Sequence, residues 1–180
     1  MEDDEIIENI MKSHTKMASA MSNRFNNMKL VRRIWLDQAD PKEAIRVIVK
    51  MKDIPLASDL LNQLLRPEAK RHLSLDLCVL LLPLITDMMR ENYEEHLSTA
   101  MKATLLLYSS FSGIIEESLN VMINPNSQVD INLEARAGKC QSCKKLFGEI
   151  KRLIIERSAE FAQVSSELAV LSRRTAKSIR

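Results

Sequence analysis

Glycine and aromatic residues are scarce in this sequence. Of its 180 residues only three are glycine, and Phe, Tyr and Trp together make up 4%. Leu, Ile, Met, Ala, Lys and Glu are abundant instead, which is typical of helices rather than of strands joined by tight turns. With 46% apolar residues, a chain of this length can bury a sizeable core. The composition therefore predicts an all-α protein.

The sequence also lacks the segments that place a protein in or across a membrane. No apolar run approaches the roughly 20 residues that a membrane span needs. The start, MEDDEIIENI, is acidic where a signal peptide is basic. The three cysteines are an odd number, which does not make a disulfide framework and suits a reducing compartment. We expect a soluble, intracellular protein with no membrane partner.

Motifs for catalysis are missing as well. The sequence has no glycine-rich phosphate loop, no recognisable pair of catalytic carboxylates and no nucleophile with a histidine signature. Cys140 and Cys143 have the Cys-x-x-Cys spacing, but a structural zinc needs four ligands, and the chain adds only Cys78 and three scattered histidines. A redox motif needs a preceding strand, whereas helix is expected before Cys140. We expect buried thiols, no metal, no cofactor and no enzymatic activity.

Apolar periodicity and punctuating residues divide the chain into helices. Residues 5–36 carry apolar side chains at seven-residue intervals, which predicts one long helix whose narrow stripe lies against other helices. Asp40, Pro41 and Glu43 form a capping-box pattern before a short helix. Asp53 and Pro55 repeat the cap-then-proline pattern. Together the signals predict helices over 5–36, 41–51, 54–65, 73–89 and 92–123 and from 131 onward.

Several positions are expected to bend or end these helices. Pro83 should kink the apolar central helix because proline lacks a backbone donor. Gly113 marks a weak point in the helix over 92–123, and NPNSQ should end that helix. Asp130 is then expected to cap the last long helix. A further break is expected between Arg157 and Glu160. The whole is predicted to be a single domain, residues 1–180, with a core over about 5–155 and a C-terminal helical extension over 156–180.

Successive antiparallel helices of this kind resemble a short array. We expect about five to seven helices in an antiparallel array or bundle similar to HEAT or armadillo repeats. Charge is uneven along it, because residues 131–180 carry 11 Lys or Arg against 5 Asp or Glu, while residues 1–130 carry 15 against 19. A basic C-terminal region favours an acidic polymer. Nucleic acid is the weaker choice, since the charges lack interleaved aromatic residues.

An ordered set of stretches then resembles a known family. They are MKLVRRIW, DPKEAI, IPLASDLLN, LSLDLC with LLP, NYEEHL and VDINLEARAGKCQSCKKL. In this order they resemble the conserved C-terminal domain of the katanin regulatory subunit, the larger, non-catalytic partner of a microtubule-severing ATPase. The resemblance covers nearly the whole chain, from about residue 6 to 153. The matching positions are Val31, Arg32 and Trp35, then Asp59 to Asn62, Leu75 to Cys78, Val129 with Asp130, and Cys140 with Cys143.

The resemblance implies an interaction module. In the family, this domain binds the N-terminal three-helix bundle of the catalytic AAA ATPase subunit. The heterodimer contacts microtubules and docks spindle-pole and minus-end factors. Cytoplasm, cytoskeleton and spindle poles or centrosome are the implied locations. The family's regulatory subunits usually carry an N-terminal WD-repeat propeller, whose blades this sequence lacks, so we expect an excised domain or a shortened subunit.

Residues for partner binding follow from the same resemblance. A three-helix bundle needs an exposed apolar strip with a polar rim, in which a few anchors dominate. We expect this strip on the third helix and at the start of the fifth. The candidates are Leu56, Leu60, Tyr93, His96 and Leu97, with Arg90 and Glu94 at the rim. The alternative for Leu60 and Leu97 is a place in the core.

Basic residues are the candidates for microtubule binding. Microtubule surfaces are acidic, so clustered lysines and arginines should strengthen binding in a salt-sensitive way. The last long helix supplies one set and the end of the first helix another: Arg136, Lys139, Lys144, Lys145, Lys151 and Arg152, and Lys29, Arg32 and Arg33. A rival reading is a free-standing helical-repeat adaptor that binds some unrelated partner.

Overall fold

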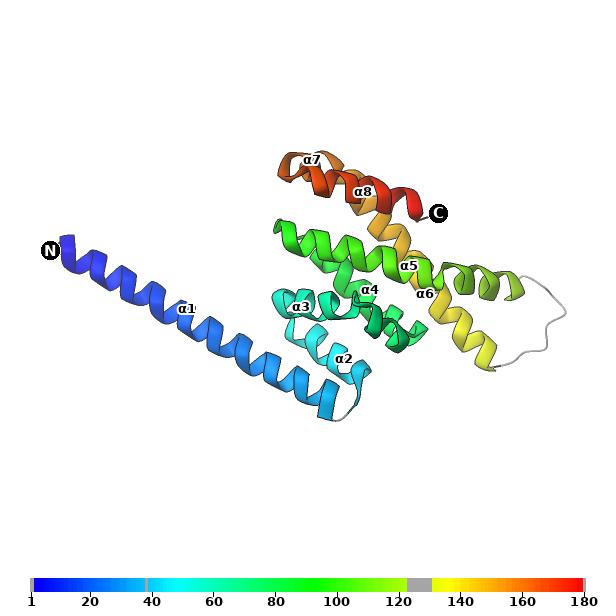
Figure 1. Ribbon diagram of the computed structural model, residues 1–180, viewed down its shortest axis with the longest axis horizontal. Helices are drawn as coiled ribbons and strands as arrows, with labels where there is room; N and C mark the ends of the chain where they lie inside the picture. Colours follow the sequence, from blue (N-terminus) through cyan, green and yellow to red (C-terminus); the bar gives the residue numbers. More distant parts are fainter. Residues whose placement is uncertain (1, 38, 123–130, 180) are drawn as a thin grey trace. The chain divides into compact units, whose positions relative to one another are not determined.

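Helices make up the described part of the protein. The computed structural model describes residues 2–37, 39–122 and 131–179. Over these residues the chain forms eight α-helices, one π-helical turn and one 3₁₀ turn, with no strand (Figure 1). The all-α prediction is confirmed. The chain divides into two compact units, Met1–Met51 and Lys52–Arg180.

The first unit contains α1 (Glu2–Arg32), a π-helical turn (Arg33–Asp37) and α2 (Pro41–Met51). A carboxylate oxygen of Asp40 accepts the backbone N–H of Glu43 at 3.0 Å, as the capping-box pattern predicts. The reciprocal half is replaced, because the Asp40 N–H donates to the Ile34 carbonyl and the Glu43 carboxylate pairs with Arg46 at 3.2 Å. The cap therefore starts α2 and ties it to the π-helical turn.

Only the C-terminal end of α1 is covered. Val31 and Ile34 are buried together with Ala44, Ile45 and Ile48 of α2. Between residues 4 and 26 every side chain of α1 is exposed. The expectation that the apolar stripe lies against other helices thus holds for its last turn, while the rest of the stripe faces outward.

The second unit contains six α-helices, and their starts follow the local sequence. A carboxylate oxygen of Asp53 accepts the Leu56 N–H at 3.0 Å, and the Ser74 hydroxyl accepts the Leu77 N–H at 3.3 Å. A 3₁₀ turn at Pro67–His72 separates the first two helices. The helices are α3 (Ile54–Leu64), α4 (Leu75–Met88), α5 (Glu94–Met122), α6 (Ile131–Glu156), α7 (Ser158–Val164) and α8 (Ser166–Ser178).

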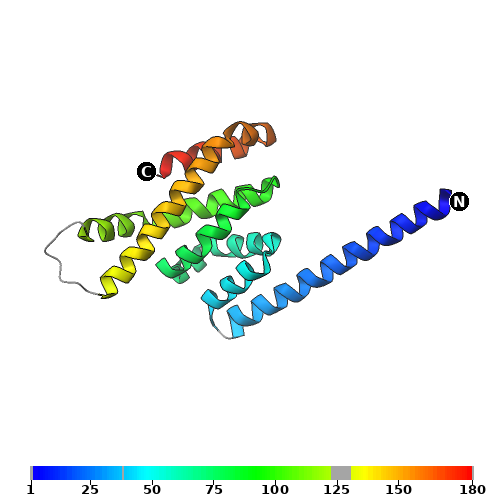
Figure 2. The same cartoon turned by 180° about the vertical axis from the view of Figure 1, so that it is seen from behind.

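α5 is the centre of the second unit. It packs against α3, α4, α6 and α8, while α6 crosses both α4 and α5 (Figures 1 and 2). Leu81 and Ile85 of α4, Met101 of α5 and Ile150 and Ile154 of α6 are at most 1% exposed. A helix that is apolar nearly all round, as predicted for residues 73–89, is therefore enclosed by its neighbours.

The C-terminal segment is part of this packing. The predicted break appears at Arg157, and a second break at Ser165 was not predicted. The Ser165 hydroxyl accepts the Leu168 N–H at 3.2 Å and starts α8. α8 packs on α5 and α6, and both its Leu168 and the residue after the helix, Ile179, are buried. Because the tail divides twice, the helices number eight rather than five to seven over the described residues.

Other predicted boundaries have mixed outcomes. Pro83 lies inside α4, and Gly113 lies inside α5 without ending it. NPNSQ and the Asp130 cap lie outside the described residues. Along the described ranges, no helix combines the length and apolar character needed to span a bilayer. The HEAT-like or armadillo-like arrangement and the single domain stay predictions.

Candidate functional site

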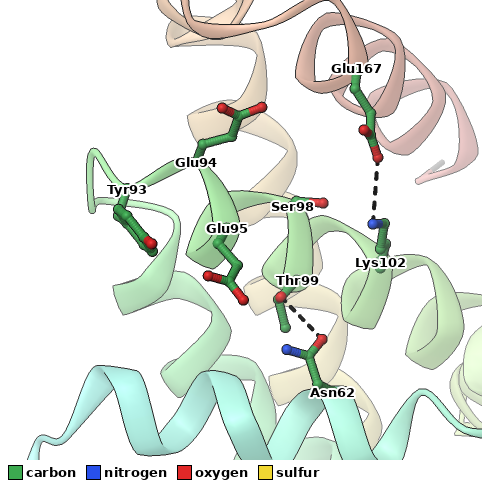
Figure 3. A pocket seen from close by; sticks show the side chains of 8 residues that line it. All are labelled: Asn62, Tyr93, Glu94, Glu95, Ser98, Thr99, Lys102 and Glu167. Carbon is green, nitrogen blue, oxygen red and sulfur yellow. Dashed lines mark hydrogen bonds and ion pairs between the residues drawn. The ribbon is translucent and has the colours of Figure 1, made fainter.

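An open groove lies at the start of α5. Its volume is about 490 Å³, and it receives side chains from α3, the loop between α4 and α5, α5 itself and α8 (Figure 3). Tyr93 and Glu94 are in the set predicted for partner binding. The lining residues are Asn62, Tyr93, Glu94, Glu95, Ser98, Thr99, Lys102 and Glu167.

Two polar contacts join the walls of this groove. The Thr99 hydroxyl donates to the amide oxygen of Asn62 at 3.2 Å and links α5 to α3. The Lys102 ammonium lies 3.6 Å from a Glu167 carboxylate oxygen and links α5 to α8 (Figure 3). The lining contains three carboxylates, Glu94, Glu95 and Glu167, and one ammonium, so the net charge of the groove is negative. An acidic groove favours a basic ligand surface.

Tyr93 supplies an exposed aromatic ring at the edge of the groove. It is 57% exposed, and its ring meets the imidazole of His96 edge-on, with centroids 4.8 Å apart. Nδ1 of His96 is buried and has no hydrogen-bond partner among the described atoms. Glu94 and Glu95 stand in the first turn of α5, where the positive end of the helix dipole stabilises carboxylates.

Arg157 holds the loop that carries Tyr93. Its guanidinium donates to the carbonyls of Met89 and Glu91 at 2.6 and 2.9 Å and to the side-chain oxygen of Asn92 at 2.7 Å. It also pairs with Glu160 at 2.7 Å. The side chain is only 17% exposed, so these contacts are partly shielded from water. One residue at the junction of α6 and α7 thereby fixes the connection between α4 and α5.

The remaining predicted partner-binding residues fall into two groups. Leu56, Leu60 and Leu97 are 3%, 9% and 1% exposed, so they lie in the core and not on an exposed strip of this chain; for Leu60 and Leu97 this is the alternative stated above. Arg90 is exposed and bridges Asp87 and Glu149 at 2.9 and 2.8 Å. The assignment of these residues to a partner interface stays a prediction.

The predicted basic set on α6 is divided by its contacts. The Lys139 ammonium pairs with Asp76 at 2.6 Å, and the Lys151 ammonium donates to the Ile179 carbonyl at 2.7 Å. Lys145 and Arg152 are exposed, and their seven-residue spacing puts them on one face of α6. Arg136 and Lys144 are exposed on other faces. The set is thus spread around the helix rather than gathered in one patch.

The second basic set belongs to the first unit. The Lys29 ammonium lies 4.4 Å from the centroid of the Phe25 ring, a cation–π geometry. Arg32 and Arg33 are exposed at the end of α1 and the start of the π-helical turn. Their role in filament binding stays a prediction.

Comparison with known proteins identifies the family. The family model described as the con80 domain of katanin matches residues 12–175. The chain belongs to this family. The resemblance seen in the sequence is confirmed by a match that covers most of α1 and all of α2 to α7.

Curated relatives of this con80 chain are katanin p80 WD40 repeat-containing subunits. Subunit B1 of Xenopus tropicalis is 30% identical over 91% of this chain, and subunit B1 of Gallus gallus is 29% identical over 87%. A homologue of subunit B1 from Arabidopsis thaliana is 34% identical over 83%. The chain spans 24%, 23% and 17% of the length of these relatives. Their names describe a WD40-containing subunit of katanin.

The cysteines of this con80 chain are buried, as predicted. Cys78, Cys140 and Cys143 are each 0% exposed. The sulfurs of Cys78 in α4 and Cys143 in α6 lie 3.9 Å apart, a contact that the sequence did not predict. Hydrogen bonding to Cys143 and burial raise the pKa of Cys78 far above its usual range. Among the described residues, no group of three or more metal-ligating side chains gathers into a site.

Sequence reasoning missed several residues of the groove. Thr99, Lys102 and Glu167 were not singled out, because single polar residues within a helix carry no periodic signal. Asn62 was quoted only as part of the family pattern Asp-Leu-Leu-Asn. Arg157 was marked only as a helix break, and its contacts lie 65 to 68 residues away in the sequence.

Proposed function

We propose that this chain is a non-catalytic regulatory module of the microtubule-severing ATPase katanin. It binds the N-terminal three-helix bundle of the catalytic AAA subunit and helps the heterodimer bind microtubules and spindle-pole or minus-end factors. Membership of the con80 family and the names of the relatives, which are WD40-containing katanin subunits, support this proposal. The proposed locations are the cytoplasm, the cytoskeleton and the spindle poles or centrosome.

The groove at the start of α5 is the observation that carries the catalytic-subunit interface. It combines an exposed aromatic ring, Tyr93, with carboxylates on α5 and α8. Aromatic residues at the centre of an interface dominate its energy, while surrounding charges set orientation and association rate. A basic face of a helical bundle therefore fits this groove, with Tyr93 as the anchor.

Isothermal titration of the complete chain with the N-terminal bundle of a katanin catalytic subunit tests the interface. We expect saturable 1:1 binding that Tyr93→Ala weakens by roughly tenfold to a hundredfold, the range of a substantial interface anchor. Ile155→Ala is the matched control, because Ile155 is 56% exposed, close to the 57% of Tyr93, and lies outside the groove. Circular dichroism of both variants confirms that they are folded.

The result also separates the two functional readings. Absence of binding by a folded chain would refute the katanin interface and leave a free-standing helical adaptor for some other partner. Equal weakening by both variants would show that the groove is not the site. Higher salt should lower the affinity, because the groove carries net negative charge.

Microtubule binding is proposed for the exposed face of α6 that carries Lys145 and Arg152. Tubulin surfaces are acidic, and these two side chains are exposed and seven residues apart. The double variant Lys145→Glu/Arg152→Glu should reduce co-pelleting with microtubules while leaving the titration with the catalytic-subunit bundle unchanged. The control is Arg46→Glu/Lys50→Glu on α2, which makes the same change in net charge. Equal loss of pelleting in both variants would indicate a nonspecific charge effect and contradict the assignment to α6.

A further inference from the structure

α1 exposes a long apolar stripe. In the described part of the first unit, the contacts that α1 makes beyond its own turns are with the π-helical turn and with α2, both next to its C-terminal end. Amphipathic helices of soluble proteins normally cover such a stripe with other helices. The large apolar residues of the stripe, each between 42% and 66% exposed, are Ile6, Ile7, Ile10, Met11, Met17, Met21, Phe25 and Met28.

The stripe follows a heptad pattern with two polar interruptions. One seam runs through residues 7, 14, 21 and 28, and the other runs through 10, 17, 24 and 31. His14 interrupts the first seam and Arg24 the second. The two interruptions lie at similar distances from opposite ends of the stripe. They can therefore face each other only if a second copy of the helix runs in the opposite direction.

Charge is distributed oppositely at the two ends of α1. Residues 4–9 contain Asp4, Glu5 and Glu8 and no basic residue. Residues 28–33 contain Lys29, Arg32 and Arg33 and no acidic residue. A helix with an acidic start and a basic end complements a second copy of itself only when the two run in opposite directions.

We propose that α1 is a self-association helix that packs antiparallel against α1 of a second copy of this chain. The two-fold axis crosses the helix pair at the level of residue 19, so that the numbers of facing seam residues add up to 38. In this register the two interruptions face each other, and apolar residues meet apolar residues in the other layers. The layers are His14 with Arg24, Met17 with Met21, Ile10 with Met28, and Ile7 with Val31, each pair joining the two copies.

The residues beside the seam are complementary in the same register. The positions directly after the second seam form one flank of the stripe, and the numbers of facing residues on this flank add up to 36. Met11 of one copy therefore faces Phe25 of the other, and Asp4 faces Arg32. The acidic and basic ends are thereby paired, and the exposed apolar residues Met11 and Phe25 are covered. The layer that pairs Ile7 with Val31 adds the least newly buried apolar surface to the dimer, since Val31 is already buried within its own chain.

A parallel pair is disfavoured by the same residues. It would place Arg24 against Arg24 and His14 against His14 within the seam, and it would bring the acidic starts together and the basic ends together. Like charges held side by side at a helix interface are destabilising. The antiparallel pair avoids each of these contacts.

Cysteine cross-linking of the complete chain tests direction. Ala18→Cys lies next to the proposed axis and should form a cross-linked dimer with a short bismaleimide. Ile7→Cys should not, because 24 residues of helix separate the two copies of residue 7, about 36 Å at the rise of an α-helix. The unsubstituted chain is the control, because its three cysteines are buried. Strong cross-linking of Ile7→Cys would overturn the antiparallel arrangement.

Charge exchange tests the register. Asp4→Arg and Arg32→Asp should each raise the dimer dissociation constant by roughly threefold to tenfold, because a facing opposite-charge pair becomes a like-charge pair. The double variant Asp4→Arg/Arg32→Asp should restore association. Failure of the double variant to recover would refute this register. Sedimentation equilibrium of the complete chain gives all four constants.

Met21→Glu separates self-association from the proposed function. It places a carboxylate in the central layer, so the chain should become monomeric while binding of the catalytic-subunit bundle at the α5 groove is retained. Ser19→Glu, on the outer face of the same helix, is the matched control and should leave the dimer intact. A folded parent chain that is monomeric at micromolar concentration would overturn the proposal. Loss of bundle binding in Met21→Glu with a monomeric parent would instead assign the stripe to the catalytic subunit.

Discussion

Replacement of Arg157 by alanine offers the sharpest test of how the groove is held. The guanidinium makes three hydrogen bonds to the connection between α4 and α5, to Met89, Glu91 and Asn92. A hydrogen bond with one charged member contributes about 1.5–3 kcal/mol when it is shielded, and less when water can replace it. Because Glu91 and Asn92 are exposed, we expect a total loss of about 2–4 kcal/mol rather than the full sum.

The loss should appear as a lower midpoint of unfolding of the complete chain. For a domain of this size, 1 kcal/mol shifts the midpoint by about 2–4 °C, so Arg157→Ala should lower it by roughly 5–15 °C. Arg157→Lys should fall between the parent and the alanine variant, because a single ammonium cannot reach all the acceptors of the planar guanidinium. Differential scanning calorimetry and urea titration measure both effects.

Arg152→Ala is the matched control. Arg152 is an exposed residue of the same helix, and its removal should change the free energy of unfolding by less than about 0.5 kcal/mol. If Arg157→Ala is as stable as Arg152→Ala, the connection between α4 and α5 does not depend on Arg157. The positioning of Tyr93 would then need another explanation.

Three further outcomes follow from packing and capping. Asp53→Ala should lower the free energy of unfolding by about 1 kcal/mol in urea titration, because the 3.0 Å hydrogen bond to the Leu56 N–H is lost; Asp53→Asn should restore most of it. Leu168→Ala should cost about 2–4 kcal/mol by the same measurement, since this side chain is 1% exposed, and an unchanged value would contradict the packing of α8. Cys78 and Cys143 should resist a thiol reagent at pH 8 until the chain unfolds, because both are buried and the pKa of Cys78 is raised; rapid labelling of the native chain would contradict this.

Local signals in the sequence predicted the helices well. The starts of α2 and α3 follow from Asp40 and Asp53, whose side chains reach backbone N–H groups only three residues away. Such caps depend on a few neighbouring residues, so they can be recognised without knowledge of the fold. Burial of Cys140 was predicted in the same way, from its place in an apolar stripe.

Contacts between distant segments could not be predicted from the same signals. The groove joins Asn62, Lys102 and Glu167, which lie far apart in the sequence and have no common pattern. The burial of Leu56 and Leu97 depends on which helices surround α3 and α5, and periodicity alone does not distinguish an interface stripe from a core stripe.

The sequence by itself determined the all-α class, the main helix boundaries and the family, because each rests on local composition, spacing or an ordered set of motifs. Only the tertiary structure decided which apolar faces are enclosed and which remain exposed. It buried the stripe of α6, brought α8 onto α5, and left the stripe of α1 open over most of its length. The physical reason is that burial is a property of pairs of surfaces, and the second surface of each pair lies elsewhere in the chain or in another molecule.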